Sequence, residues 1–277
     1  MTDTSQHALW NGPSGEVWVE AQALLDGMFA PLAEQLAGAV PAGQPAQVLD
    51  VGCGTGAVCL AIAARLGEGG HCSGVDISAP MIARAVERAA AAGLQIDFAV
   101  GDAQRHRFAP ARLDRIVSRF GVMFFDDPVQ AFANLRRATR SGGTLHALAW
   151  RSAAENPFMT TAERAAAPLL ALPPRTADGP GQFAFADRQH VRGILANSGW
   201  RDIEVTAVDQ ACSIRTTDLH RYVSLLGPVG GMLRDPRIDA ALRTRVLQVV
   251  EQAFAPFVQG DRVEFVAACW ALRAVAP

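Results

Sequence analysis

The stretch Val48-Leu49-Asp50-Val51-Gly52-Cys53-Gly54-Thr55-Gly56 decides the fold. A short apolar run such as its first half is typical of a strand buried on both faces of a parallel sheet. The glycines that follow let the backbone turn tightly, and they let a ligand approach without obstruction by a Cβ atom. Residues 57–66 continue with helical spacing. The stretch therefore predicts a strand, a ligand-binding turn and a helix in succession.

The alternation of strand and helix continues along the chain. Apolar or alternating runs bounded by turn residues predict further strands at residues 71–76, 96–100, 114–120, 144–150, 203–208 and 263–275. Helical spacing predicts helices over residues 81–92, 129–140 and 188–198. Strands separated by helices imply right-handed crossovers and a parallel sheet covered on both faces. We therefore expect an α/β fold with a doubly wound, mostly parallel sheet of seven strands.

Helical segments accompany this sheet at three places. Residues 1–45 are predicted to form a helical cover, because one stripe recurs there at helical spacing. The stripe consists of Trp18, Gln22, Leu25, Met28, Phe29 and Leu32. Residues 46–277 are predicted to form the main domain. Proline-broken helical segments at about 152–182 and 217–258 interrupt it, and we interpret them as insertions over one edge of the sheet.

Composition and charge argue against several classes of partner. The net charge of −2 over 277 residues gives no general attraction to a phosphate backbone, so nucleic acid is not an expected partner. No apolar run is long enough to span a bilayer, and the polar start of the chain resembles no secretory signal. The five cysteines form no C-x-x-C pair. Free thiols of this kind favour a cytoplasmic location, and no two histidines lie at metal-ligand spacing, so no metal is expected.

Three acidic residues are placed at the ends of consecutive predicted strands. Asp50 precedes the glycine turn, where a carboxylate can accept a hydrogen bond from a ligand ammonium group and would repel a pyrophosphate. Asp76 ends the second strand and is placed to accept both hydroxyls of a ribose. Asp102 follows the third strand, where a carboxylate can accept from an adenine amine. Because ligands in open α/β sheets lie at the carboxyl ends of the strands, the three acids predict one site.

The chain resembles the class I S-adenosylmethionine-dependent methyltransferases, and most of all the branch that contains quinone C-methyltransferases and many small-molecule enzymes. The matching motifs occur in order over residues 48–150. They are the glycine turn, Gly74-Val75-Asp76-Ile77-Ser78, Gly101-Asp102-Ala103, Ser118-Arg119-Phe120-Gly121 and residues 135–143. The last motif departs from the family pattern, because Ser141 stands where the family has proline. The resemblance implies a Rossmann-like methyltransferase fold with helical lid insertions.

The resemblance also implies S-adenosylmethionine as the cofactor and a role for each matching residue. Asp50, Gly52 and Gly54 would line its methionine part, and Asp76 would bind the ribose. Ile77 and Met81 would flank the adenine, while Asp102 and the backbone N–H of Ala103 would bind its edge. The candidate cofactor-binding residues also include Cys53, Arg119 and Phe120. For Arg119, three interpretations stay open: contact with the cofactor carboxylate, contact with an acidic acceptor, and an ordinary surface arginine.

Aromatic and apolar residues near the strand ends are candidates for an acceptor pocket. The candidate substrate-binding residues are Trp10, Trp18, Gln22, Met123, Phe124 and Trp150. Aromatic faces enclose apolar ligands and attract a methyl donor that carries positive charge. For Trp18 and Phe120, pocket lining and simple packing are both open, whereas Phe29 is interpreted as packing. Tyr222, the sole tyrosine, is either a lid contact or a packing residue.

The expected function is transfer of a methyl group from S-adenosylmethionine to an oxygen, nitrogen or carbon of a small, fairly apolar metabolite. Such an in-line displacement needs alignment and exclusion of water more than acid–base groups, so no catalytic residue is assigned. One alternative is a non-catalytic module that binds the cofactor. Another is a nicotinamide-dependent oxidoreductase, because Gly52-x-Gly54-x-x-Ala57 also fits a dinucleotide turn. The chain has no lysine and one tyrosine, so it cannot build a Ser…Tyr-x-x-x-Lys set.

Overall fold

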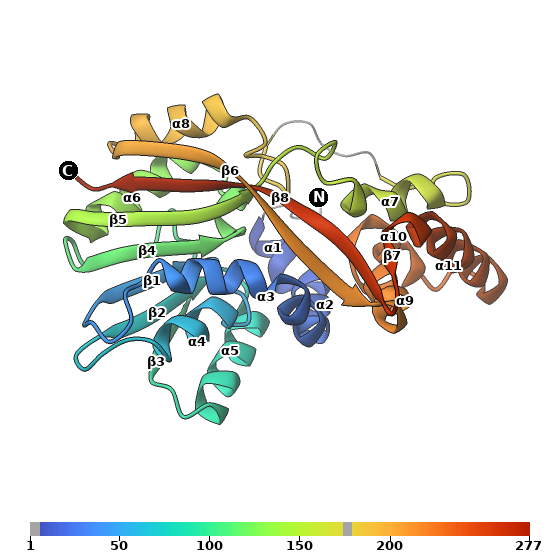
Figure 1. Ribbon diagram of the computed structural model, residues 1–277, viewed down its shortest axis with the longest axis horizontal. Helices are drawn as coiled ribbons and strands as arrows, with labels where there is room; N and C mark the ends of the chain where they lie inside the picture. Colours follow the sequence, from blue (N-terminus) through green and yellow to red (C-terminus); the bar gives the residue numbers. More distant parts are fainter. Residues whose placement is uncertain (1–5, 174–178) are drawn as a thin grey trace.

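A computed structural model describes residues 6–173 and 179–277. Its strands form one sheet in the order β3-β2-β1-β4-β5-β8-β6, and the short β7 pairs with β8 (Figure 1). The strands are β1 (Gln47–Val51), β2 (His71–Asp76), β3 (Ile96–Val100), β4 (Leu113–Arg119), β5 (Thr139–Trp150), β6 (Arg201–Arg215), β7 (Val258–Gln259) and β8 (Arg262–Val275). The strands β1 to β5 pair in parallel, and β8 runs antiparallel to its neighbours β5 and β6. The predicted mostly parallel α/β sheet is confirmed, with the two-residue β7 in addition.

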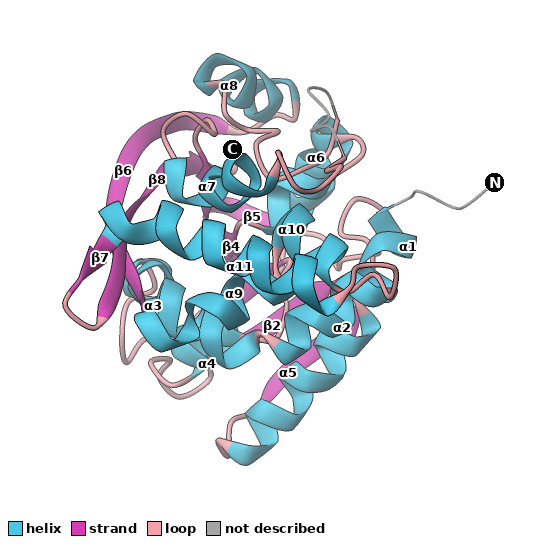
Figure 2. Ribbon diagram, turned by 90° about the vertical axis from the view of Figure 1, so that its right-hand side faces the viewer, coloured by secondary structure: helices cyan, strands magenta, loops and turns pink. Residues whose placement is uncertain are grey.

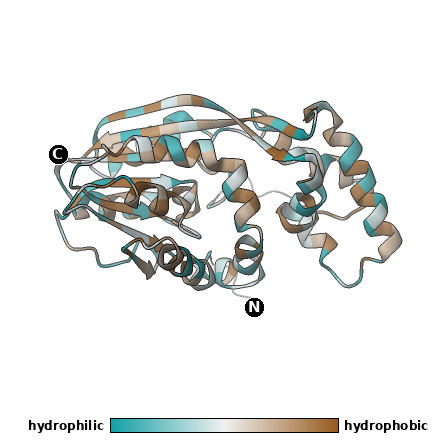
Figure 3. Cartoon of the chain, turned by 60° about the horizontal axis from the view of Figure 1, so that its bottom comes forward, coloured by the Kyte–Doolittle hydropathy of each residue, from teal (hydrophilic) through white to brown (hydrophobic). Residues whose placement is uncertain are grey.

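Helices cover both faces of this sheet. Figure 2 shows α6 and α8 on one side of the sheet and α3 and α4 on the other. The first eight helices are α1 (Gln6–Asn11), α2 (Pro13–Glu20), α3 (Gln22–Gly38), α4 (Ala57–Ala63), α5 (Ala79–Ala91), α6 (Pro128–Ala138), α7 (Pro157–Ala166) and α8 (Arg188–Asn197). Apolar residues recur along the strands and alternate with hydrophilic ones along the helices (Figure 3). The buried core lies between these layers and includes Val48, Ile62, Ile116, Phe132 and Leu145. This is the doubly wound arrangement that the sequence predicts.

The N-terminal stripe is not one straight helix. The chain changes direction at Ala21, between α2 and α3, and α3 is kinked at Phe29, two residues before Pro31. Proline lacks the N–H that a helix interior needs, and its ring clashes with the preceding turn. Leu25 and Phe29 are buried, but Trp18 is 38% exposed. The predicted boundary of the cover at residue 45 stays a prediction.

The later helices lie at the end of the sheet where the parallel strands terminate. The second predicted insertion contains α9 (Leu219–Leu225), α10 (Gly227–Leu233) and α11 (Ala240–Phe254). Strands β6 and β8 continue past the other strands as a two-stranded ribbon that carries these helices (Figure 1). The prediction of a strand over residues 203–208 was too short, because pairing with β8 extends β6 to Arg215. Helix α7, from the first insertion, packs against α11. Within the described ranges, no helix is long and apolar enough to cross a membrane.

Candidate functional site

The glycine turn after β1 is held in a left-handed conformation. Gly52, Gly54 and Gly56 have φ values of 65°, 55° and 84°, a region that residues with a Cβ atom adopt only at a cost. The N–H of Gly54 donates to Asp76 Oδ2 at 2.8 Å. The N–H of Gly52 donates to the carbonyl of Val75 at 2.8 Å. The turn is therefore tied to the end of the neighbouring strand β2, and its residues Gly52 and Gly54 line a cavity.

Asp50 is a buried acid with spare hydrogen-bonding capacity. Its side chain is 1% exposed, and its Oδ2 accepts a hydrogen bond from the thiol of Cys59 at 3.4 Å. Its Oδ1 has no partner within the described part of the chain. Burial raises the pKa of Asp50 to about 7, while the Cys59 thiol and the Arg119 charge oppose this rise. A buried carboxylate oxygen without a donor is costly, and a ligand ammonium group would satisfy it.

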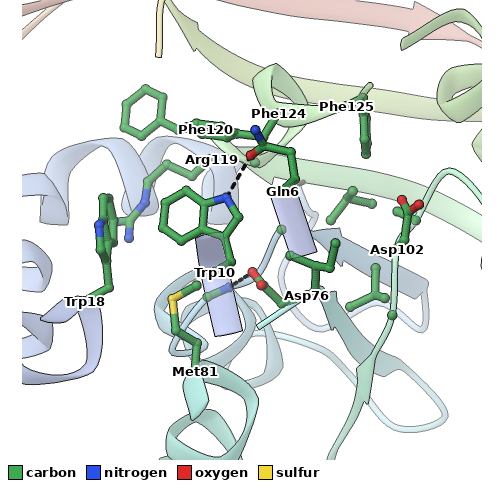
Figure 4. A pocket seen from close by; sticks show the side chains of 18 residues that line it. Gln6, Trp10, Trp18, Asp76, Met81, Asp102, Arg119, Phe120, Phe124 and Phe125 are labelled. Atoms are coloured by element: carbon green, nitrogen blue, oxygen red, sulfur yellow. Dashed lines mark hydrogen bonds between the residues drawn. The ribbon is translucent and has the colours of Figure 1, made fainter. Parts of the chain in front are cut away.

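Asp76 and Asp102 line one cavity of about 130 Å³ at the strand ends (Figure 4). Asp76 Oδ1 accepts from the N–H of Ser78 at 2.9 Å, in addition to the bond from Gly54. Burial raises the pKa of Asp76, and these backbone donors oppose that rise. Asp102 Oδ1 accepts from the N–H of Gln104 at 2.9 Å. The same cavity is lined by Gly52, Gly54, Ile77, Met81, Ala103, Arg119 and Phe120.

Arg119 is half-buried, and its charge acts on Asp50. Its Nη1 donates to the carbonyl of Phe29 at 3.3 Å. Burial lowers the pKa of Arg119, and the nearby charges of Asp26 and Asp50 oppose this change. The interpretation of Arg119 as an ordinary surface residue is therefore wrong. It lines both the 130 Å³ cavity and a smaller one of about 80 Å³, which Asp50 and Cys53 also line.

The N-terminal helices are bonded to the loop that follows β2. Asn11 Nδ2 donates to the carbonyl of Ile77 at 2.9 Å, and the N–H of Ala79 donates back to Asn11 Oδ1 at 2.9 Å. Ser78 Oγ donates to the carbonyl of Trp10 at 2.7 Å. These bonds place Trp10 over the 130 Å³ cavity, where its indole N–H donates to Gln6 Oε1 (Figure 4).

A larger cavity of about 500 Å³ adjoins the first. The residues that line both cavities are Trp10, Trp18, Phe120 and Phe124. Met123 and Trp150 line the larger cavity alone. Apart from Gln22, the predicted substrate-binding residues therefore meet at one place. Gln22 lines the 80 Å³ cavity instead, and it bonds to Asp26 and Arg84.

Phe120 stands at the junction of the cavities. It adopts a left-handed conformation, with φ 70° and ψ −6°, which is uncommon for a residue with a large side chain. Its ring stacks on Trp150, with the centroids 4.1 Å apart and the planes 13° from parallel. Phe29 contacts both rings and lines the larger cavity. The interpretation of Phe29 as packing alone was therefore incomplete.

Comparison with known proteins identifies a domain in this chain. Residues 48–143 match the family model of a methyltransferase domain. An uncharacterized protein of Mycobacterium tuberculosis is 29% identical over 170 residues, which span 61% of this chain and 59% of that protein. Nocamycin O-methyltransferase of Saccharothrix syringae is 32% identical over 118 residues, 42% of each chain. The structure of an S-adenosylmethionine-dependent methyltransferase from Aquifex aeolicus gives a TM-score of 0.56 at 14% identity, over 95% of this chain and 98% of that one.

Residues 48–143 carry a methyltransferase domain, and S-adenosylmethionine is its cofactor. Two features of this methyltransferase domain fit its cofactor. The unpaired Oδ1 of Asp50 suits the ammonium group of the methionine part, and Asp50 lines the 80 Å³ cavity together with Gly52 and Gly54. Cys53 lies in the same turn, and burial raises the pKa of its thiol to about 11, so this thiol stays protonated.

Several residues of the methyltransferase site escaped prediction. Gln6, Gly101 and Phe125 line the smaller of the two main cavities. The larger one is closed by residues of the insertions, among them Phe158, Met159, Tyr222, Val223, Leu225, Leu226 and Val229. Helical periodicity shows which side of an inserted helix is apolar, but not which part of the fold that side meets. The isolated tyrosine was the one signal in this group.

Proposed function

We propose that the protein transfers a methyl group from S-adenosylmethionine to a small, fairly apolar molecule bound in the larger cavity. The observation that carries this proposal is the shared wall of the two cavities, formed by Trp10, Trp18, Phe120 and Phe124. A donor in the first cavity and an acceptor in the second would meet at this wall. Aromatic faces there stabilise a cationic donor and exclude water from the reacting atoms.

The chain's own residues would bind and orient the two reactants. When bound, S-adenosylmethionine supplies an electrophilic methyl carbon on a sulfonium. Asp50 would hold the ammonium group of the methionine part, and Arg119 would hold its carboxylate. The hydrogen bonds from Gly54 and Ser78 keep the Asp76 carboxylate in place for the ribose hydroxyls. Asp102 and the N–H of Ala103 would read the adenine edge, with Ile77 and Met81 on either side.

An oxygen is the acceptor atom that we favour. The relative from Saccharothrix syringae is by name an O-methyltransferase. The apolar lining of the larger cavity suits a molecule with few charges, and its volume of about 500 Å³ lies within the range of drug-sized ligand sites. In this proposal, catalysis comes from alignment of donor and acceptor in a closed, dry site.

Calorimetric titration with S-adenosylmethionine and, separately, with NADH tests the proposal. We expect the wild-type protein to bind the sulfonium compound and not the dinucleotide. Asp76→Ala should weaken binding roughly a hundredfold, because each hydrogen bond to a charged group contributes about 1.5–3 kcal/mol. Asp97→Ala is the matched control. Asp97 lies on β3, the strand next to β2, and its side chain is 84% exposed. Selective binding of NADH, or equal loss in both variants, would overturn the proposal.

A further inference from the structure

Tyr222 is the single tyrosine of the chain, and it lies in the wall of the larger cavity. It belongs to α9, in the second insertion. Its neighbours in that wall are mostly apolar, among them Phe158, Met159 and Leu226. Polar groups are few there, so each of them bears on which acceptors fit.

The Tyr222 hydroxyl makes no hydrogen bond to any part of the chain that the structure describes. Tyr222 is half-buried in this wall. Its hydroxyl is therefore open to a hydrogen-bond partner that a ligand in the cavity can supply. Arg234, in the same wall, already has hydrogen-bond partners. Its Nη1 donates to the carbonyls of Ser224 and Leu225 at 3.1 and 2.7 Å.

The surroundings of Tyr222 determine which partner suits it. Burial and the negative charge of Glu163 raise the pKa of Tyr222. The phenol therefore keeps its proton at neutral pH and serves as a hydrogen-bond donor, not as a base. Glu163 also lines the cavity, and its charge disfavours an anionic group beside it. A neutral oxygen that accepts a hydrogen bond satisfies both conditions.

Tyr222 lines the larger cavity but not the smaller one, whereas the four aromatic residues of the shared wall line both cavities. We propose that the larger cavity selects acceptors with a neutral carbonyl oxygen on an apolar ring system, and that the Tyr222 hydroxyl binds this oxygen while another atom of the acceptor faces the methyl donor. This inference rests on the proposed methyl transfer, and it makes Tyr222 a specificity-determining residue.

The sole tyrosine allows a residue-specific experiment. Protein made with 3-fluorotyrosine carries a single fluorine label, at Tyr222. With S-adenosylhomocysteine present, it is titrated with 1-tetralone, an aromatic ketone, and with tetralin, which has the same rings without the oxygen. We expect 1-tetralone to bind about threefold to tenfold more tightly than tetralin, as one neutral hydrogen bond predicts. The ketone should also give the larger shift of the fluorine resonance.

Two variants complete the test. Tyr222→Phe should lose the preference for 1-tetralone and leave the affinity for tetralin and for S-adenosylhomocysteine unchanged. Leu226→Ala, an apolar change in the same wall, should weaken both ring compounds alike. Equal affinity of the wild type for the two compounds, failure of 1-tetralone to bind, or retention of the preference in Tyr222→Phe would overturn the inference. Failure to bind the cofactor product as well would instead count against the proposed function.

Discussion

Gly52 and Gly121 lie in direct backbone contact. A Cβ atom on Gly52 would lie 2.5 Å from the Cα of Gly121, and one on Gly121 would lie 2.6 Å from the Cα of Gly52. These residues follow β1 and β4, which are neighbours in the sheet. The contact brings the glycine turn against the segment that starts with Phe120, so it helps to place that ring between the cavities.

Gly121→Ala should therefore disturb both the fold and the site. Overpacking of this kind costs about 1–3 kcal/mol, and the affinity for S-adenosylmethionine should fall with it. Gly193→Ala is the matched control, because Gly193 lies inside α8 with no atom near its would-be Cβ. The control should gain roughly 0.5–1 kcal/mol. Urea denaturation and calorimetry check both variants, and wild-type stability and binding in Gly121→Ala would contradict the prediction.

The left-handed conformation of Phe120 predicts an unusual order of stability. Phe120→Ala and Phe120→Gly both remove the stack on Trp150, so both should lower methyl transfer. Glycine adopts a positive φ without the cost of roughly 1–2 kcal/mol that other residues bear. We therefore expect Phe120→Gly to be about 1 kcal/mol more stable than Phe120→Ala. Thermal unfolding compares the stability of the two variants. Greater stability of the alanine variant would show that the left-handed conformation of Phe120 is not strained.

The raised pKa of Asp50 predicts a pH dependence of stability. The pKa lies at about 7 in the folded protein, against 3.8 ordinarily. Between these values the unfolded chain ionises this acid and the folded protein does not, so Asp50 disfavours folding increasingly as pH rises. The full effect is on the order of 4 kcal/mol above pH about 7. The stability of Asp50→Asn should match that of the wild type at pH about 4 and exceed it at pH about 8. Denaturation curves recorded at these two pH values check the prediction.

Cofactor affinity should show the opposite trend. The ionised carboxylate is the form that binds an ammonium group, so the affinity of the wild type for S-adenosylmethionine should rise as pH increases through about 7. Asp50→Asn should bind weakly at every pH in this range. Calorimetric titration between pH about 5.5 and about 8 measures both profiles. A flat profile for the wild type would show that Asp50 does not contact the ammonium group.

Asn156 joins the loop after β5 to β8. It is fully buried, its Nδ2 donates to the carbonyl of Ala268 at 3.0 Å, and its Oδ1 accepts from the N–H of Ala268 at 2.9 Å. Asn156→Ala should cost about 3 kcal/mol, because it leaves buried backbone groups without partners. Thr160→Ala removes only an exposed bond within α7 and should change stability by less than about 0.5 kcal/mol. Urea denaturation compares the stability of the two variants. Equal losses of stability would contradict the role given to the Asn156 hydrogen bonds.

Some elements were predictable because their signals are local. The strands predicted at 71–76 and 96–100 match the structure residue for residue. Each is a compact run bounded by turn residues, and parallel strands in a covered sheet have this pattern. Parallel strands also end at the same edge of the sheet, so three strand-end acids were expected to lie together. Asp76 and Asp102 line one cavity, and Asp50 lines the adjoining smaller one.

Other features depend on partners that are distant in the chain. Gln22 bonds to Arg84, and Arg119 bonds to the carbonyl of Phe29, contacts that span 62 and 90 residues. Neither contact leaves a trace in local periodicity, so the place of Gln22 beside the 80 Å³ cavity was not predicted, and three interpretations of Arg119 stayed open. The full length of β6 was likewise hidden, because pairing with β8 sets it.

The sequence by itself determined the succession of strands along the chain, the glycine turn and the acids at the strand ends, because each of these follows from neighbouring residues and from the geometry of a parallel sheet. Only the tertiary structure decided the acceptor side. It brought α7 and α9 against the aromatic residues after β4 and β5, and so placed Tyr222 in the same cavity as Trp150. Packing between distant segments is set by the shape and burial of whole surfaces, which a local pattern of residues does not encode.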